Sequence, residues 1–171
     1  MASGDIVGIV TAIMGPLASA APPSAIAGAS TPAESVPVWE FGTSADQFLD
    51  CYCTLGTNYA GGGITLRLAW TATANANEAR IGAAFRRLAD DADDLDSTSH
   101  SYDYNYADLT APSAVGEVVY DDITFTDGSD MDDVDAGESF ILRITRDQDH
   151  GNDDLAGTFQ LLATAIQIRE T

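Results

Sequence analysis

The sequence predicts an all-β fold, an antiparallel β-sandwich of about eight strands. Hydrophobic and polar residues alternate with a period of two in most of the apolar runs, which is typical of half-buried strands. Gly, Asp and Ser separate these runs at short intervals, and no long run favours a helix. At 171 residues, the chain has the length of one domain with a sizeable core.

The strongest pattern lies in the last third of the chain. The run 140–146 places Phe140, Leu142 and Ile144 on one face. In the run 157–169, the apolar residues change parity near 163–165, which predicts a bulge or a strand that passes from one sheet to the other. We expect these two runs to form an antiparallel pair joined by the acidic loop 147–154.

Six more runs are expected to form strands. Pro37 suits an edge strand because its nitrogen cannot donate to a ladder. The run 64–70 is the clearest, since every second residue from Ile64 is large and apolar. The alanine content of 80–88 leaves a helix open there, and Asp121 and Asp122 disturb the last run. In chain order, the six runs are 36–41, 48–55, 64–70, 80–88, 101–106 and 115–126.

Residues 1–38 differ in composition from the sandwich domain that we place at 39–171. They hold five of the six prolines and only two charges, Asp5 and Glu34. The apolar run 6–14 is too short to span a bilayer. A signal peptide is disfavoured, because the residues ahead of this run include Asp5 and no Lys or Arg. We therefore interpret 1–38 as an extended arm.

An apolar, proline-rich arm cannot build a core by itself and would be an aggregation hazard if it lay free in water. Either the surface of the domain or another protein must hold it. We favour a partner protein and leave the folded-back arm open as the alternative. The candidate partner-binding residues are Ile6, Val7, Ile9, Val10, Ile13, Met14 and Leu17.

Charge excludes several functions. The chain has 27 Asp and Glu against 7 Arg and no Lys, a net charge of −20 that repels nucleic acids and anionic membranes. Twenty of the acidic residues lie between Asp90 and Asp154. Most of them are expected in solvated loops, and calcium is the cofactor that such clusters favour. No cluster matches an EF-hand loop, and the best candidate metal ligands are Asp147, Asp149, Asp153 and Asp154.

Other motifs point to structure rather than catalysis. Cys51 and Cys53 face the same side of one strand, where a disulfide would be strained, so we expect two buried free thiols. The run Gly61-Gly62-Gly63 leads into a strand and lacks the helix N-terminus that binds phosphate. The chain contains no recognisable catalytic constellation, and we do not expect an enzyme.

One strand face carries three aromatic residues. Such a face suits stacking on sugar rings or nucleobases, and it equally suits a core or a subunit contact. We expect the subunit contact, where a ring buries area while its hydroxyl keeps a polar partner. The residues are Tyr102, Tyr104 and Tyr106.

Three segments carry a resemblance to a known family. They are 59–70 (YAGGGITLRLAW), 84–87 (AFRR) ahead of 93–96 (DDLD), and 136–147 (AGESFILRITRD) ahead of 154–157 (DLAG). In these segments the chain resembles small virion proteins of tailed phages and prophages, over roughly 39–170. The resemblance implies a jelly-roll domain on the virion that acts as a capsid cement (decoration) protein or as part of a fibre. It also implies trimers.

Charge and resemblance lead to the same expected location. A chain of charge −20 is repelled by packaged DNA, so we expect it on the outer surface of the capsid. Its expected partners are the major capsid protein, gripped by the arm, and two further copies of itself. The alternative is a receptor- or glycan-binding module of a head or tail fibre, with the tyrosine face or the acidic loops as its site.

Overall fold

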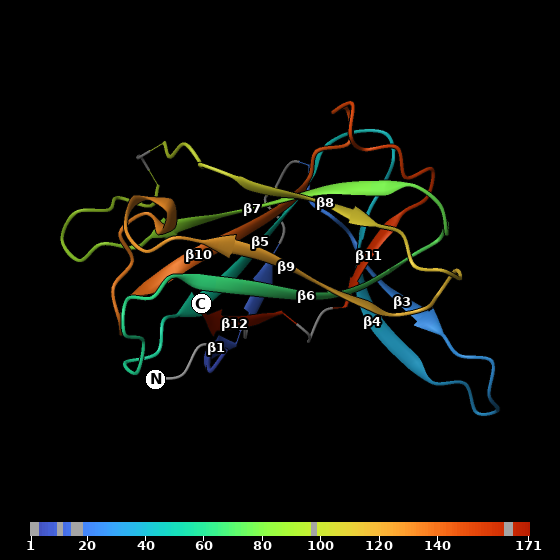
Figure 1. The fold of residues 1–171 in the computed structure, drawn as a ribbon, viewed down its shortest axis with the longest axis horizontal. Coiled ribbons are helices and arrows are strands. Elements are labelled where there is room, and N and C mark those ends of the chain that lie inside the picture. The colour runs from blue at the N-terminus through green and yellow to red at the C-terminus, as the bar shows by residue number, and fades with distance from the viewer. Residues whose placement is uncertain (1–3, 10–11, 15–18, 97–98, 163–165) are drawn as a thin grey trace.

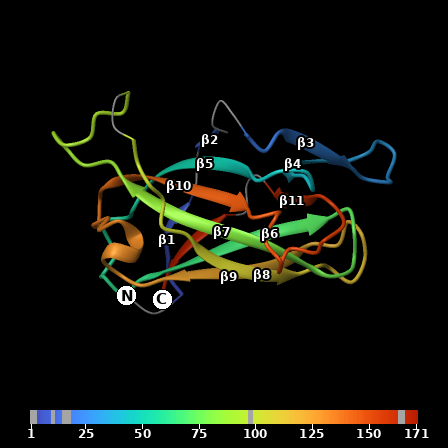
Figure 2. The same ribbon diagram turned by 90° about the horizontal axis from the view of Figure 1, so that it is seen from above.

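The computed structural model is a jelly-roll-like antiparallel β-sandwich, which confirms the predicted fold class (Figure 1). It describes residues 4–9, 12–14, 19–96, 99–162 and 166–171. This part of the chain contains twelve strands and one short 3-10 helix, η1 (Ser129–Met131). The two sheets form two layers, whose strands overlap in the view of Figure 2.

One layer is a five-stranded sheet with the order β2-β5-β10-β7-β8. Its central strand, β10, pairs along its whole length with β5 and nearly so with β7. The strands are β2 (Ala12–Met14), β5 (Gln47–Thr54), β7 (Glu78–Arg87), β8 (Asn105–Thr110) and β10 (Ser139–Arg146).

The other layer is a seven-stranded sheet with the order β1-β12-β6-β11-β4-β3, in which β9 pairs with the second side of β6. β11 and β12 follow one another along the same side of β6. The strands are β1 (Ile6–Ile9), β3 (Pro23–Ala27), β4 (Ser35–Phe41), β6 (Ile64–Ala72), β9 (Val119–Phe125), β11 (Phe159–Leu162) and β12 (Gln167–Glu170).

The core lies between the layers and follows the alternation in the sequence. Ile64, Leu66, Leu68 and Trp70 of β6 are fully buried, as are Phe140, Leu142 and Ile144 of β10. Trp70 stacks on Phe159 at a centroid distance of 4.5 Å, and its indole N–H donates to the Asp121 carboxylate at 2.7 Å. Asp121 and Asp122 therefore do not disturb β9, which pairs with β6 without a break.

The expected pairing of the last two long runs is wrong. β10 belongs to the five-stranded sheet, whereas β11 and β12 belong to the seven-stranded one. The connection 147–158 crosses between the layers, and the buried ion pair of Arg146 with Asp153 holds it there (2.7 Å). The change of parity that the sequence shows near 163–165 falls between β11 and β12, and both strands belong to the same sheet. Residues 163–165 themselves lie outside the described residues.

The structure also differs from the expected extended arm. In the described part of 1–38, β1 pairs with β12, β2 with β5 and β3 with β4. Val7 is 3% exposed in the core, so it cannot contact a partner, while Ile6 is 47% exposed. Ile9, Ile13 and Met14 lie in β1 and β2, and Val10 and Leu17 lie outside the described residues. These apolar segments pair with strands that would otherwise be open edges of the domain's own sheets.

Cys51 and Cys53 are buried free thiols, as predicted. Burial raises the pKa of Cys53 to about 12, and it also raises the pKa of Cys51, with Cys53 and Asp50 adding to the effect. The folded thiols stay neutral at pH values where unfolded thiols ionise, from about pH 8.5 upward.

We expect the thiols to make the fold less stable in alkali. The raised pKa of a thiol stabilises the folded protein fully below about pH 8.5. This stabilisation is lost as the pH rises towards the pKa of the thiol in the folded protein. For Cys53, this loss should reach about 2 kcal/mol at pH 10. Urea unfolding at pH 8 and pH 10 should show a smaller pH dependence in Cys53→Ala than in the wild type. Equal pH dependences would contradict the expectation.

No helix in the described part of the chain is long and apolar enough to cross a membrane.

Candidate functional site

Three tyrosines lie in a row on the outer face of the five-stranded sheet. Tyr106 belongs to β8, and Tyr102 and Tyr104 come just before this strand. Neighbouring ring centroids are 6.0 Å and 5.7 Å apart, and the ring planes differ by only 33° and 37°. We call these residues the tyrosine row. The predicted common face is confirmed, although the strand itself starts at Asn105 rather than at residue 101.

A glycine in the neighbouring strand makes room for the row. Gly82 of β7 pairs with Tyr106, and a Cβ at Gly82 would lie 2.6 Å from Cε1 of that ring. Only a residue without a side chain allows the ring to lie this close to the sheet. Gly82 thus lets the Tyr106 ring pack close to the sheet, and Tyr106 remains 39% exposed.

Arg143 of β10 supports the other end of the row. Its guanidinium donates to both oxygens of Asp50, at 2.6 Å and 2.8 Å, and lies 4.1 Å from the centre of the Tyr102 ring. The Asp50 carboxylate raises the pKa of Arg143. Burial raises the pKa of Tyr104 to about 12. The row is therefore neutral, and a paired cation holds it in place.

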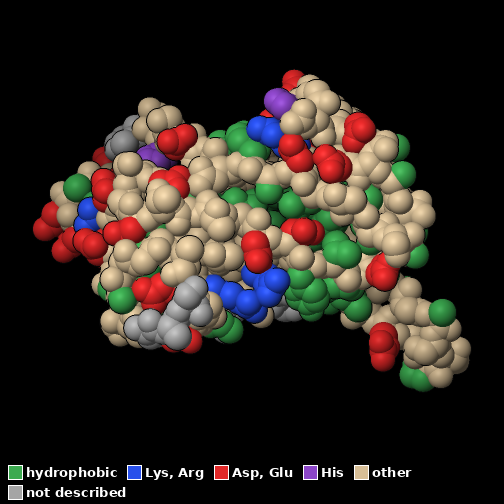
Figure 3. All heavy atoms as spheres, viewed as in Figure 1, with side chains coloured by type: hydrophobic (Ala, Val, Ile, Leu, Met, Phe, Trp, Pro, Cys, Tyr) green, Lys and Arg blue, Asp and Glu red, His purple; other side chains and the backbone are tan. Residues whose placement is uncertain are grey.

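The row ends at a groove between the two layers. β8 is the edge of its sheet, β9 lies on the outer side of β6, and the groove runs between them. Its volume is about 610 Å³, which is within the usual range for small-molecule sites. On this face, hydrophobic side chains gather between acidic ones (Figure 3). The lining residues are Arg80, Tyr104, Asn105, Tyr106, Ala107, Asp122, Ile123 and Thr124.

The polar groups of the groove are held in fixed positions. Asn105 donates from its side-chain amide to the carbonyl oxygen of Thr124 at 2.8 Å, which ties β8 to β9. The Arg80 guanidinium lies 4.5 Å from the centre of the Tyr106 ring and pairs with Asp108 at 2.9 Å. Aromatic faces and ordered hydrogen-bonding groups thus meet in a groove that is open to solvent.

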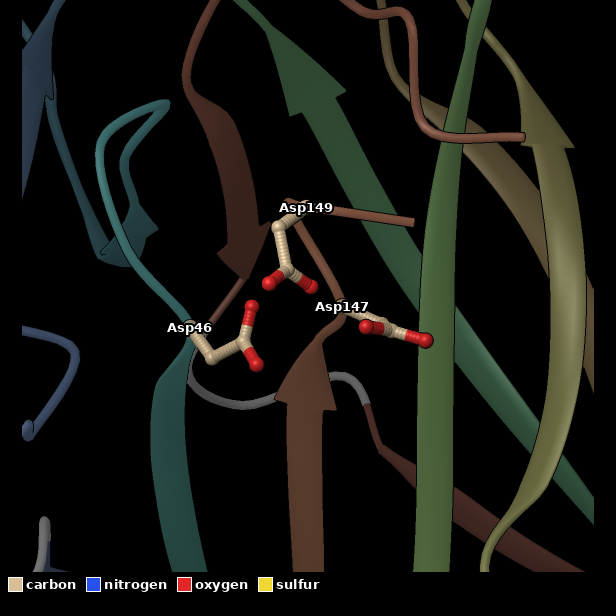
Figure 4. Close-up of side chains that lie close together, drawn as sticks. All are labelled: Asp46, Asp147 and Asp149. Atoms are coloured by element: carbon tan, nitrogen blue, oxygen red, sulfur yellow. The ribbon is translucent and has the colours of Figure 1, made fainter. Parts of the chain in front are cut away.

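The predicted calcium ligands are only partly brought together. Asp147 and Asp149 meet Asp46, with one carboxylate oxygen of each lying within 4.8 Å of the others (Figure 4). Asp153 is not in this group because both of its oxygens bond Arg146, and an oxygen of Asp154 accepts from the backbone N–H of Glu78.

Other contacts already occupy this acidic group. Asp147 pairs with Arg80 at 3.3 Å, and Asp46 accepts from the backbone N–H of Gln148 at 2.9 Å. Three carboxylates offer at most six oxygens, and the contacts with Arg80 and Gln148 engage two of them, whereas calcium prefers six to eight. The arrangement does not reproduce the four-aspartate site that the loop sequence indicated.

Sequence reasoning found the tyrosine row but missed the groove. Arg80, Asn105 and Asp122 belong to three strands, and no spacing in the sequence links them. A partial signal was present in Gly82, since a glycine inside a strand often marks a close approach by another group.

Comparisons with known proteins identify no family. No family model matches the chain, and no curated protein matches it. Among solved structures, it is similar to TmCBM61 in complex with β-1,4-galactotriose, with 7% identity, a TM-score of 0.42, and coverage of 94% of this chain and 88% of that one. It is also similar to the CBM22-1 xylan-binding domain of Paenibacillus barcinonensis Xyn10C, with 13% identity, a TM-score of 0.47, and coverage of 98% and 95%.

A third similar structure is the Endo-D glycoside hydrolase domain of Streptococcus pneumoniae R6, with 13% identity and a TM-score of 0.38. The alignment covers 92% of this chain but only 21% of that one. At these identities and TM-scores, the likenesses carry no argument about function, which has to rest on the chain's own residues.

Proposed function

We propose that this protein is a glycan-binding module and that its site is the groove between β8 and β9 together with the tyrosine row. The observation that carries the proposal is the meeting of Tyr104 and Tyr106 with Arg80, Asn105 and Asp122 in one open groove. A sugar ring presents C–H groups on its faces and hydroxyl groups around its rim. Aromatic rings suit the faces, and carboxylate, amide and guanidinium groups suit the hydroxyls.

The charge of the chain favours a glycan over other ligands that stack on aromatic rings. Nucleobases come with phosphates, which a chain of charge −20 repels. A neutral polysaccharide meets no such repulsion. The fixed positions of Asn105 and Arg80 also reduce the entropy that binding would cost.

The test compares two tyrosines that have equal exposure. Tyr106 and Tyr52 are both 39% exposed, but Tyr52 lies on β5 and does not line the groove. A glycan array should first identify a ligand for the wild type. Tyr106→Ala should then weaken its binding about two- to tenfold, because an aromatic contact is worth about 0.5–1.5 kcal/mol. Tyr52→Ala should bind as the wild type does.

Two outcomes would count against the proposal. One is equal binding by Tyr106→Ala and the wild type. The other is a change in the mass of Tyr106→Ala, measured by light scattering, which would favour the predicted subunit contact of the tyrosine row instead. The wild-type mass, measured alongside, provides the reference for both variants.

A second candidate function is decoration of the outer surface of a virion, as the sequence resemblance implies. The charge of −20 favours this location, because it keeps the chain away from packaged DNA. The two candidate functions are compatible, since a phage surface protein that binds host glycans would perform both. Labelling of intact particles with an antibody against the chain tests the location independently of glycan binding.

A further inference from the structure

The hairpin of β3 and β4 projects from the sandwich, at the lower right of Figure 1. β4 pairs with β11 only from Val38 onward, so the part of the hairpin around 24–37 is a two-stranded ribbon in the described structure. β3 is the last strand of its sheet, so its outer edge has no partner strand among the described residues. A ribbon of two strands is marginally stable alone in water, and an open edge is a template for another strand.

The hairpin also carries little charge. Residues 6–33 contain no charged residue, and the ribbon itself carries only Glu34. The hairpin in Figure 3 accordingly shows little charge compared with the acidic body. Ile26 and Val36 face each other across the ribbon, with Val36 40% exposed. The surface therefore offers apolar area and backbone hydrogen-bonding groups rather than charge.

We propose that this hairpin joins two copies of the chain, with β3 pairing antiparallel to β3 of the second copy. The charge of the body excludes a basic partner at this edge. A basic partner would be drawn to the acidic body, not to a neutral ribbon. Two identical acidic bodies repel each other wherever their surfaces approach, and contact through projecting hairpins keeps the bodies apart. Antiparallel pairing of one strand with its own copy is the self-complementary contact that two-fold symmetry requires.

This dimer is independent of the proposed glycan site, which lies on β8 and β9. Sedimentation velocity of the full chain at increasing concentration should show two chains of 17.9 kDa in one particle. Added salt should strengthen the dimer, because it screens the repulsion between the acidic bodies. A contact held by ion pairs between acidic residues and arginines would weaken in salt.

The decisive variant places a like charge at the contact. Ile26→Glu should raise the dissociation constant of the dimer at least tenfold. The control is Val115→Glu, which adds the same charge at a residue that is 60% exposed and lies outside the hairpin. Val115→Glu should remain dimeric.

Hydrogen exchange tests the same contact without a substitution. The amides of β3 should be protected at concentrations where the chain is dimeric and should lose this protection on dilution. A wild-type chain that is monomeric at every concentration and salt overturns the proposal. So does an oligomer that Ile26→Glu leaves intact, including a trimer held by the tyrosine row.

Discussion

Replacing Arg146 with Met should lower the free energy of unfolding by about 3–5 kcal/mol, which is the usual cost of removing one partner of a buried ion pair. Both Arg146 and Asp153 have side chains that are 1% exposed. Without the guanidinium, the Asp153 carboxylate would remain buried with no opposite charge. For a chain of this length, the loss corresponds to a fall in Tm of about 6–20 °C.

The contacts of Arg146 explain why a single residue has so large an effect. Its guanidinium donates to both oxygens of Asp153 and to the carbonyl oxygens of Gly157 and Leu155, at 2.7–2.9 Å. It also donates to the carbonyl oxygen of Phe41 at 3.2 Å, at the end of β4. One side chain therefore joins the five-stranded sheet, the crossing connection and the seven-stranded sheet.

A matched control separates burial from charge. Arg67 pairs with Asp122 at 3.1 Å, but their side chains are 32% and 41% exposed. Exposed pairs of this kind contribute about 0–1 kcal/mol, so Arg67→Met should change the stability little. Urea unfolding of the two variants beside the wild type makes the comparison. Similar losses in both variants would mean that Arg146 is not the main tie between the layers.

Residue parity predicted the inner faces of the sheets, because parity is a local property of a strand. It placed Ile64 and Leu66 of β6 and Phe140 and Leu142 of β10 correctly in the core. Parity cannot say which strand lies beside which. The alternation in β11 is the same whether that strand pairs with β10 or, as it does, with β4 and β6.

A charged residue at a core-facing position was the sequence signal that the chain crosses between the sheets after β10. Arg146 has the same parity as Phe140, Leu142 and Ile144, so a strand with that core face has to bury its guanidinium. A buried guanidinium needs a carboxylate and several carbonyl oxygens nearby. The acidic loop that follows β10 supplies them, which makes this loop a structural crossing rather than a solvated hairpin tip.

The candidate site shows the same division between local and long-range information. The tyrosine row could be predicted because its members are two residues apart along one segment. The groove could not, since it forms where β8 and β9 meet, and the distance between two edge strands depends on the packing of whole sheets. The arm was misjudged for a related reason: its apolar composition fits a partner protein and an open sheet edge equally well.

Replacing Gly63 with Ala should destabilise the protein by about 3 kcal/mol, for two reasons that add. Gly63 has a φ of +89°, where a residue with a side chain costs about 1–2 kcal/mol. A Cβ at this position would also lie 2.6 Å from the carbonyl oxygen of Phe125 at the end of β9. Backbone cannot move aside as a flexible side chain can, and overpacking of this kind costs about 1–3 kcal/mol.

Gly61 provides the control because it shares the first penalty and lacks the second. Its φ is +83°, but the nearest atom to its Cβ would be a carboxylate oxygen of Asp127 at 3.6 Å. Gly61→Ala should therefore cost only the 1–2 kcal/mol of backbone strain. The difference between the two variants, measured by urea unfolding, is the cost of pushing β9 away from the start of β6. Equal losses would show that β9 yields without cost, and the close approach of Gly63 to Phe125 would then contribute nothing to the stability of the fold.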